Sequence, residues 1–548
     1  MEFLTESIEI TKSNWINTIC VLLALYTSRF YYRYFTRPDK CPGPIPLPFV
    51  GNLFQLLKIE KIHRGLHRRY GDVFEMYMGG ERYIFFNCGG DNLFDKIASS
   101  STKTNYFNRV STNENLEDLG FEKNGLVANR DPRNWRRNRK ILSHIIMSTK
   151  FLHGLVMKCQ DLFLEAEGYW AQLGHNTELD YSKWSTHFVT DITIELAIGE
   201  RAYSLASYYN MLCSTFFKSN NKEEIAEFPT SLINHAEEFN KNIMQWPISL
   251  FYIASIPSWM RHYVPVFSHF DRKCKRNFTW MKNEMESMIA KRQKETNDNN
   301  EKSLAKTDLL TLLMTNSVED DNKTASSFME ETSQTVIEVC AAGIDTTAAT
   351  FCFLIYLLDR NPHVKEELLK EFESVLGQDI YRPCTYADLG KMQYCEAVVK
   401  ETLRLIPPVP FIPKFANEDD EINQYKIKAG TTIWLNVQQA HASDWTDPAE
   451  FDPSRFLKDS FSSETDKYSM KNFVPFGVGV RKCPGILMAI TELKTLTVLL
   501  YRKYDVKLAG QSKELNASYA GITQCHDLKL DAKMDAQIGE LKGLIGGQ

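Results

Sequence analysis

The stretch "FVPFGVGVRKCPGILMAITE", Phe473–Glu492, places a cysteine after a glycine-rich run and before an apolar pattern typical of a helix. The cysteine is Cys483. Backbone N–H groups of a glycine-rich turn, together with the positive end of a helix dipole, favour a thiolate over a thiol. A thiolate held in this way is suited to binding a metal ion. The stretch alone leaves the identity of the metal open.

Two other uses of this stretch can be weighed from the sequence. Gly477 and Gly479 form a G-x-G, but Lys482 occupies the place of the third glycine of a dinucleotide fingerprint, and no clear strand precedes it. We therefore reject a Rossmann site. A cysteine nucleophile needs a histidine partner. The nearest histidines along the chain, His441 and His526, lie in no recognisable motif.

Composition limits the class of protein. The chain has 548 residues, which is long enough for one large domain with an extensive core. Its formal net charge of −5 gives no support for a nucleic-acid partner, because such proteins usually carry a basic excess. The 12 cysteines include no C-x-x-C pair, so we expect reduced thiols in a reducing compartment. Except for Cys483, we expect the cysteines to be small buried apolar side chains.

An apolar run near the N-terminus, Trp15–Tyr32, predicts a membrane anchor. As a helix it would span about 27 Å, close to the hydrocarbon thickness of a bilayer. No small-residue cleavage site follows the run, which favours an uncleaved anchor over a signal peptide. Basic residues follow the run and mostly acidic residues precede it, so the positive-inside rule leaves the rest of the chain in the cytosol.

The remaining patterns predict one large, mainly helical domain. Two β-like runs flank Gly79-Gly80 and predict a hairpin, and Tyr425–Val437 predicts a second hairpin around Ala429-Gly430. Ile289–Asp308 is polar and predicts a surface loop. Phe328–Asp359 contains no proline and predicts one long helix.

The segment "AAGIDTT", Ala341–Thr347, lies in the middle of that long helix. Gly343 costs about 1 kcal/mol relative to alanine at such a position. Tight helix packing through small side chains would explain Gly343, but it would not explain an acid in an apolar segment. Asp345 and Thr346 could together supply an acid and a hydroxyl for proton delivery.

Two pairs of polar side chains have the spacing of one helix face. Trp135 and Arg139 are separated by four residues and could bind a carboxylate, although a basic, solvated face explains them equally. Glu401 and Arg404 are separated by three residues. Taken alone, they are an exposed helix pair worth about 0.3–0.5 kcal/mol.

Together these segments resemble the cytochrome P450 superfamily, the haem-thiolate monooxygenases, in its membrane-anchored microsomal form. The resemblance covers about Cys41–His526. The pattern F-x-x-G-x-R-x-C-x-G is met by Phe476, Gly479, Arg481, Cys483 and Gly485, and the pattern A-G-x-D-T-T by Ala342, Gly343, Asp345, Thr346 and Thr347. E-x-x-R is met by Glu401 and Arg404, W-x-x-x-R by Trp135 and Arg139, and P-x-R-F by the stretch that contains Arg455.

The resemblance implies a mainly α fold with small β-sheets, formed by a single large domain that follows an N-terminal transmembrane helix. The expected organisation is a short N-terminal segment (1–14), a transmembrane anchor (15–32), a basic, proline-rich joint (33–52), the haem-thiolate catalytic domain (53–530) and a C-terminal tail (531–548). The implied cofactor is haem b.

The family's site roles fall on the matching positions. Cys483 would be the axial ligand of the haem iron, and its thiolate would favour O–O cleavage. Phe476, Gly479 and Gly485 would shape the loop beneath the haem. The propionates would be bound by Trp135, Arg139 and Arg481, and by Lys414, where many members carry arginine or histidine. Asp345 and Thr346 would deliver protons. Glu401, Arg404 and Arg455 would form a buried network, in which loss of one partner typically costs about 3–5 kcal/mol.

The expected function is insertion of one oxygen atom from dioxygen into a small apolar substrate, with the domain on the cytosolic side of the endoplasmic reticulum membrane as a single-pass protein. Electrons would come from a separate NADPH-cytochrome P450 reductase, with cytochrome b5 as an additional donor. Basic residues would face these acidic donors, and the candidates are Lys471, Arg481, Lys482 and the cluster 133–140. The alternatives are a haem-thiolate isomerase or dehydratase, and a non-catalytic haem sensor or carrier.

Overall fold

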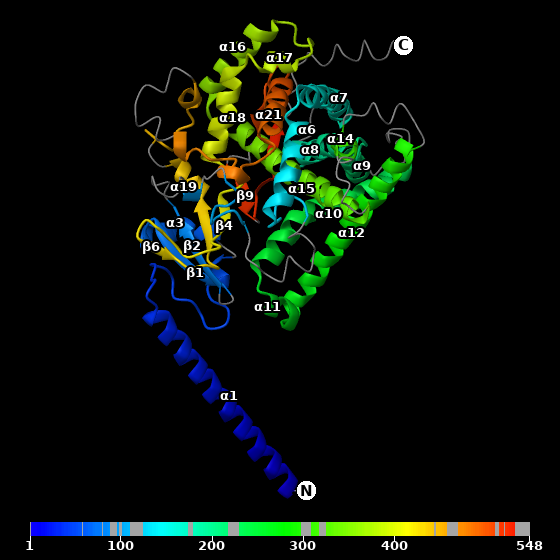
Figure 1. Cartoon of the computed structure of the whole chain (residues 1–548). Coiled ribbons are helices and arrows are strands. Elements are labelled where there is room, and N and C mark those ends of the chain that lie inside the picture. The colour runs from blue at the N-terminus through cyan, green and yellow to red at the C-terminus, as the bar shows by residue number, and fades with distance from the viewer. Residues whose placement is uncertain are drawn as a thin grey trace.

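The computed structural model has one helical body, small sheets and a projecting N-terminal helix (Figure 1). The residues that it describes are 2–56, 59–78, 81–87, 96–97, 101–109, 124–173, 179–216, 230–297, 308–316, 325–442, 445–457, 470–509, 514–519 and 521–531.

The helices lie in the order α1 (Glu2–Thr36), α2 (Leu53–Leu56), α3 (Ile59–Tyr70), α6 (Pro132–Ile146), α7 (Thr149–Leu173), α8 (Tyr181–Ile198), α9 (Ser204–Phe216), α10 (Thr230–Ser255), α11 (Ser258–Tyr263), α12 (Pro265–Asn297), α14 (Leu309–Asn316), α15 (Ala325–Arg360), α16 (Pro362–Leu376), α17 (Tyr386–Leu389), α18 (Gln393–Leu405), α19 (Val437–Ala442) and α21 (Ile486–Tyr501), with short 3-10 turns η2 (Pro453–Phe456) and η4 (Gly479–Arg481). The strands are β1 (Val73–Met78), β2 (Glu81–Phe86), β3 (Leu179–Asp180), β4 (Phe411–Phe415), β5 (Asp420–Ile422), β6 (Tyr425–Ile427), β7 (Thr432–Asn436), β8 (Lys507–Leu508), β9 (Asn516–Tyr519), β10 (Thr523–His526) and β11 (Lys529–Asp531).

Helix α15 runs through the main core, which confirms the expected long helix. Its apolar side chains are almost fully buried, for example Phe351, Leu354 and Leu358, and it packs against α8, α12, α18 and α21. Gly343 lies where α8 approaches. A Cβ atom at Gly343 would be 3.3 Å from the methyl group of Thr193. Close helix packing therefore accounts for this glycine, and the helix is regular through it.

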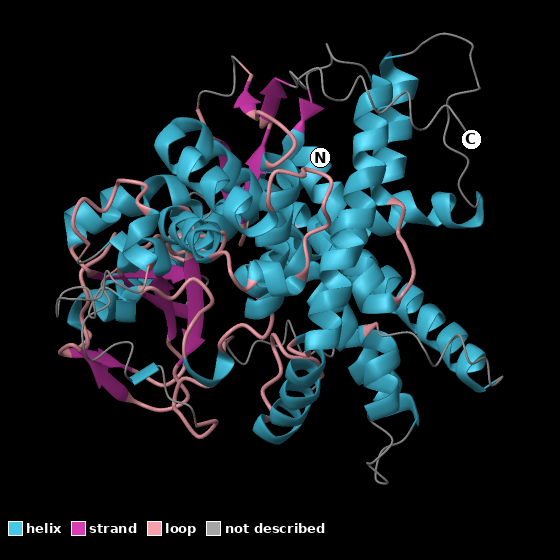
Figure 2. Ribbon diagram, turned by 90° about the horizontal axis from the view of Figure 1, so that it is seen from above, coloured by secondary structure: helices cyan, strands magenta, loops and turns pink. Residues whose placement is uncertain are grey.

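The strands form small separate groups beside the helices (Figure 2). The largest sheet has the order β1-β2-β7-β4. β1 and β2 are antiparallel, as the hairpin prediction required. β2 pairs with β7 in parallel, so that Ile84 lies beside Ile433, and β4 is antiparallel to β7. This sheet positions the strand that carries Lys414.

Two predictions of local structure are wrong. β6 and β7 do not form the expected hairpin, because β6 pairs with β5 around Asn423 and Gln424, and β7 enters the larger sheet. The segment 289–297 is the last part of α12 rather than a loop. Its Arg292 is buried and pairs with Asp308 at 3.0 Å, and residues 298–307 lie outside the described part of the chain.

Helix α1 is one continuous helix of 35 residues, which is longer than the predicted anchor. It projects away from the body (Figure 1), and its side chains Val21, Leu22 and Leu25 are 57%, 59% and 63% exposed. Among the described residues, length and apolar composition select a different candidate span, Met329–Arg360. That helix is 78% buried in the body, as a core helix would be.

The described cysteines are all free thiols, and most are buried as expected. Cys20 is an exception, because it is exposed on α1. Cys213 and Cys525 are partly exposed. Cys88 lies outside the described residues.

Candidate active site

The loop that carries Cys483 is held in a tight turn by two glycines and a backbone hydrogen bond. Gly477 and Gly479 have φ angles of 76° and 68°, a left-handed conformation that glycine adopts without a side-chain clash. The N–H of Cys483 donates to the carbonyl of Phe476 at 2.8 Å. Gly485 is the N-cap of α21, so Cys483 lies two residues before the N-cap, as the sequence predicts.

The surroundings of Cys483 act on its pKa in opposite directions. Burial raises the pKa of the thiol, while a hydrogen bond from the Gly485 backbone and the charges of Arg109 and Arg139 lower it. From the sequence we expected the loop and the helix dipole to favour the thiolate. In the structure burial is the largest of these influences, and the pKa of the Cys483 thiol is raised. A coordinated metal ion deprotonates a thiol outright.

Arg481 is buried beside this loop, with 3% of its surface exposed. Its guanidinium donates to the carbonyls of Phe107 at 3.2 Å and Leu126 at 2.6 Å, and also to that of Asn129. It lies over the rings of Phe107 and Trp135, at 4.2 and 4.7 Å from their centroids. Arg481 therefore cannot face an electron donor, and that part of the donor-surface prediction is wrong.

Three more cations lie close enough to Arg481 or to Cys483 for their charges to interact. They are Arg109, Arg139 on α6 and Lys414 on β4. Burial lowers the pKa of each, and that of Lys414 falls to about 7, with the charges of Arg109 and Arg481 adding to the effect. None of these cations, nor Arg481, forms a recorded ion pair with a carboxylate of the described residues.

This cation cluster, defined as Arg109, Arg139, Lys414 and Arg481, tests whether haem fits the site. One buried carboxylate, Glu338, is near enough for its charge to act on Arg481 and Arg109, but its Oε2 accepts from the backbone N–H groups of Leu126 and Val127. Four cations against one carboxylate leave an excess of positive charge that is costly to bury, so the cluster favours further anions from outside the chain. Two carboxylates near Cys483 would satisfy it, and haem carries two propionates. The residues present therefore fit haem b: the cluster would hold the propionates and the cysteine would bind the iron.

Arg109 was not singled out in the sequence. Its guanidinium donates to the carbonyl of Arg481, and its Nε has no partner among the described residues. The stretch "YFNRV" around it matches no motif with a physical signature, and its position becomes evident only when the fold brings it to the cysteine loop.

The other candidate residues lie on α15. Asp345 is buried, and its Oδ2 accepts a hydrogen bond of 3.1 Å from Gln524 on β10. Burial raises the pKa of Asp345 to about 6, and the Gln524 hydrogen bond opposes this rise. The Thr346 hydroxyl donates to the carbonyl of Ala342 at 2.6 Å. Ala342 is exposed, and Gly343 and Thr346 are partly exposed, whereas the neighbouring residues of the helix are buried, so this face is open.

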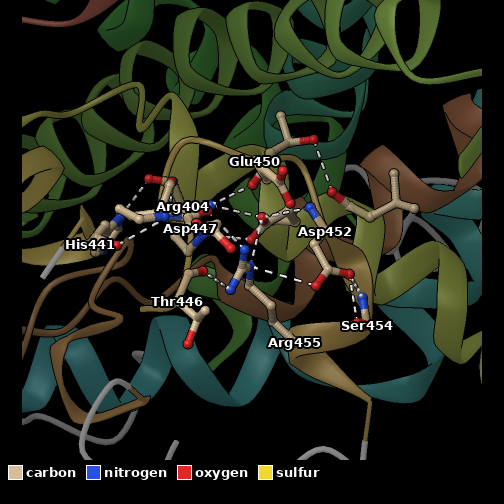
Figure 3. Close-up of polar contacts among 12 residues, drawn as sticks. Arg404, His441, Thr446, Asp447, Glu450, Asp452, Ser454 and Arg455 are labelled. Atoms are coloured by element: carbon tan, nitrogen blue, oxygen red, sulfur yellow. Dashed lines mark hydrogen bonds and ion pairs between the residues drawn. The ribbon is translucent and has the colours of Figure 1, made fainter. Parts of the chain in front are cut away.

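Figure 3 shows the polar contacts around Arg404 and Arg455, which form a network with Glu401. Glu401 and Arg404 are fully buried, and two guanidinium nitrogens lie 2.6 and 2.8 Å from the two carboxylate oxygens. Arg404 also donates to the carbonyls of Pro448 and Glu450, at 2.8 and 3.0 Å. Arg455 lies 3.4 Å from Glu401. The pair is thus not the exposed helix pair that its spacing alone suggested.

His441 connects this network to the cysteine loop. Its Nδ1 lies 3.3 Å from the carbonyl of Arg404, and its Nε2 accepts from the N–H of Val474 at 2.9 Å. Burial lowers the pKa of His441 to about 3, so the ring is neutral. These partners fix the tautomer with the proton on Nδ1.

Comparison with known proteins gives the family. The family model described as Cytochrome P450 matches residues 41–524. The chain belongs to the cytochrome P450 family. It is 26% identical to Cytochrome P450 3A17 of Cavia porcellus over 496 residues, covering 90% of each chain. It is 24% identical to Probable cytochrome P450 4d20 of Drosophila melanogaster, over 86% of this chain and 88% of the relative.

A plant relative carries the name of a reaction. The P450 chain is 27% identical to Flavonoid 3'-monooxygenase CYP75B137 of Crocosmia x crocosmiiflora, over 90% of this chain and 91% of the relative. With the family established, this cytochrome P450 is a haem-thiolate monooxygenase, and its cofactor is haem b. When bound, the haem iron supplies the activation of dioxygen.

Proposed function

We propose that this cytochrome P450 inserts one oxygen atom into a small apolar substrate, with Cys483 as the axial ligand of the haem. The observation that carries this proposal is the excess positive charge of the cation cluster, which Glu338 offsets only in part, beside the glycine-rich loop of Cys483. Trp135 belongs to the same arrangement, because its ring supports the Arg481 guanidinium. Phe476, Gly479 and Gly485 shape the loop around the sulfur.

Asp345 and Thr346 move protons on the open face of α15. A carboxyl with a pKa near 6 is close to neutral pH, so it can both release and take up a proton. Gln524 holds Asp345 in one orientation. The Thr346 hydroxyl can exchange its bond to the Ala342 carbonyl for a bond to a water molecule or to the substrate.

The Glu401–Arg404–Arg455 network and His441 position the cysteine loop. Glu401 accepts from the backbone N–H of Asp452 at 2.9 Å, and His441 accepts from that of Val474. The first contact joins α18, and the second joins α19, to the backbone of the C-terminal part of the chain. The network therefore fixes the position of the loop whose cysteine would bind the haem.

Electrons come from a separate NADPH-cytochrome P450 reductase, and cytochrome b5 is an additional donor. Lys471, which precedes the cysteine loop, and Lys482, which lies within it, are exposed, as are Arg133 and Lys140 on α6. These side chains provide a basic surface on the cysteine side of the haem. An acidic donor would be steered to this surface.

Helix α1 anchors the protein in the endoplasmic reticulum membrane as a single span. Its support is the exposed apolar surface between Trp15 and Tyr32 and the basic residues that follow. The division into segments at residues 14, 32, 52 and 530 is part of this proposal. The catalytic domain then lies on the cytosolic side.

The decisive experiment is the spectrum of the reduced carbon monoxide complex of the purified protein. We expect the band typical of thiolate ligation, and we expect Cys483→Ala to lack it while Cys395→Ala, a buried thiol elsewhere, retains it. Product formation should require NADPH and reductase. Retention of the band by Cys483→Ala would contradict the ligand assignment, and turnover without reductase would contradict the monooxygenase reaction.

A further inference from the structure

A second cavity lies between the C-terminal half of α1 and the body, and it shares no lining residue with the haem site. Its volume is about 440 Å³, within the range of small-molecule sites. Its lining includes Tyr26, Arg29, Arg33, Tyr34, Phe49 and Trp259. The walls thus come from α1, from the proline-rich joint and from α11, which lies at the same end of the molecule (Figure 1).

The charge on the α1 wall is positive and mostly uncompensated. Arg29, Arg33 and Arg37 are spaced four residues apart and share one helix face. Arg37 is neutralised by the buried Glu75 and also donates to the carbonyl of Tyr34. Arg29 and Arg33 are exposed, and neither has a recorded ion pair with a described carboxylate. Two guanidinium groups are therefore free to bind an anion in this cavity.

The surface beside these arginines is apolar and aromatic. The rings of Tyr26 and Phe49 stack with centroids 4.2 Å apart, and Trp259 is 39% exposed. Leu25 and Leu22, one and two turns before Arg29, are exposed. An occupant must therefore carry an anionic end for the arginines and an apolar part for this side of α1. Tyrosine and tryptophan rings are also typical of the level of lipid headgroups.

We propose that this cavity binds the phosphate-bearing headgroup of one anionic phospholipid. Arg29 and Arg33 hold the phosphate by paired N–H donors, in the geometry that arginine forms with phosphate. The acyl chains lie along Leu22 and Leu25. The inference rests on the proposed membrane anchorage. Its consequence is that a single lipid fixes the angle between α1 and the catalytic domain.

The test uses the full-length haem-loaded protein in detergent and native mass spectrometry with phosphatidylserine. We expect one retained phosphatidylserine per protein, and about 30-fold weaker retention by the double variant Arg29→Gln/Arg33→Gln, which corresponds to about 1 kcal/mol for each arginine. The matched control Lys370→Gln/Lys391→Gln removes the same charge at the opposite end of the molecule and should retain the lipid. All forms should keep the reduced carbon monoxide band.

Three results would overturn the headgroup site. They are equal retention by the double variant, equal loss in the control, and displacement of the lipid by millimolar inorganic phosphate, which would indicate a free-phosphate site. Flotation with neutral phosphatidylcholine vesicles tests anchorage separately, because both the wild type and the double variant should float. Failure to float would contradict the anchor, whereas flotation without phosphatidylserine retention would contradict the headgroup site alone.

Discussion

Glu492 is a buried carboxyl that should make the protein less stable as the pH rises. It lies on α21 near Cys159 of α7 with 1% of its surface exposed, and its Oε1 has no hydrogen-bond partner among the described residues. Burial raises the pKa of Glu492 from 4.5 to about 8. Between these values the folded state holds more protons than the unfolded state, so stability from this group is present at low pH and is lost as the pH rises.

The size of the effect follows from the two pKa values. The loss is about 1.4 kcal/mol for each pH unit and levels off above the folded pKa. Between pH 6 and pH 8 it amounts to about 2 kcal/mol, an upper value for a group of this burial. The variant Glu492→Gln removes the ionisation but leaves a buried amide. The amide changes the stability by the same amount at every pH. The ionisation of Glu492 is therefore measured by how the difference in stability between the variant and the wild type changes with pH.

The assay is thermal unfolding of the haem-loaded protein at pH 6, 7 and 8. A single scan rate is needed, because proteins of this size often unfold irreversibly. About 1 kcal/mol corresponds to about 1 °C in a chain of 548 residues. We expect Glu492→Gln to gain about 2 °C on the wild type between pH 6 and pH 8. The exposed Glu366→Gln on α16 is the control and should follow the wild type.

A result in which Glu492→Gln and the wild type change in parallel with pH would refute the reasoning. It would mean that Glu492 is ionised at neutral pH in the folded protein, through a partner or a water molecule that offsets its burial. A gain by Glu366→Gln of the same size would also refute it, because the effect would then be a general response to removing a negative charge.

Three further predictions concern the site. Arg404→Lys keeps the charge but provides three donors in place of the guanidinium fork, so at least one buried acceptor loses its hydrogen bond. The free energy of unfolding should fall by about 2–4 kcal/mol, measured by loss of the reduced carbon monoxide band in urea. Lys400→Arg on the same helix is the control and should have little effect. Gln524→Leu removes the hydrogen bond that lowers the pKa of Asp345, so the pH profile of turnover should move to higher pH; an unmoved profile would exclude Asp345 as the titrating group. Lys482→Glu should raise the KM for reductase several-fold, most strongly at low salt, with a normal spectrum; an unchanged KM would move the donor surface elsewhere.

Local spacing predicted the parts of the site that lie on single elements. Trp135 and Arg139 share α6, and Glu401 and Arg404 share α18, because helical periodicity fixes which side chains share a face. Burial was not predictable from spacing. A spacing of three residues fits an exposed pair as well as the buried Glu401–Arg404 pair. In the sequence, only the family pattern E-x-x-R indicated that this pair is buried.

The errors come from competition between local and distant contacts. Ala429-Gly430 is a plausible turn, but β7 finds a partner in β2, and the true two-residue turn is Asn423-Gln424, with φ angles of 47° and 64°. The segment 289–297 has few apolar residues, Ile289 and Ala290, yet lysine, arginine, glutamine and glutamate form helices well. Arg109 was missed because its role depends on a fold that brings residues 109 and 481 together.

The parallel pairing of β2 with β7 has a consequence for synthesis on the ribosome. β2 ends at Phe86 and β7 begins at Thr432, so some 350 residues separate the two partners. At about 5–20 residues per second the ribosome needs roughly 20–70 s to deliver β7. During that interval the hairpin of β1 and β2 has an unpaired edge that carries Tyr83, Ile84 and Phe85, a surface prone to pairing with other chains. The nascent chain is therefore most exposed to aggregation until β7, near the start of the last fifth of the sequence, emerges, and chaperones that protect strand edges would be needed before that point.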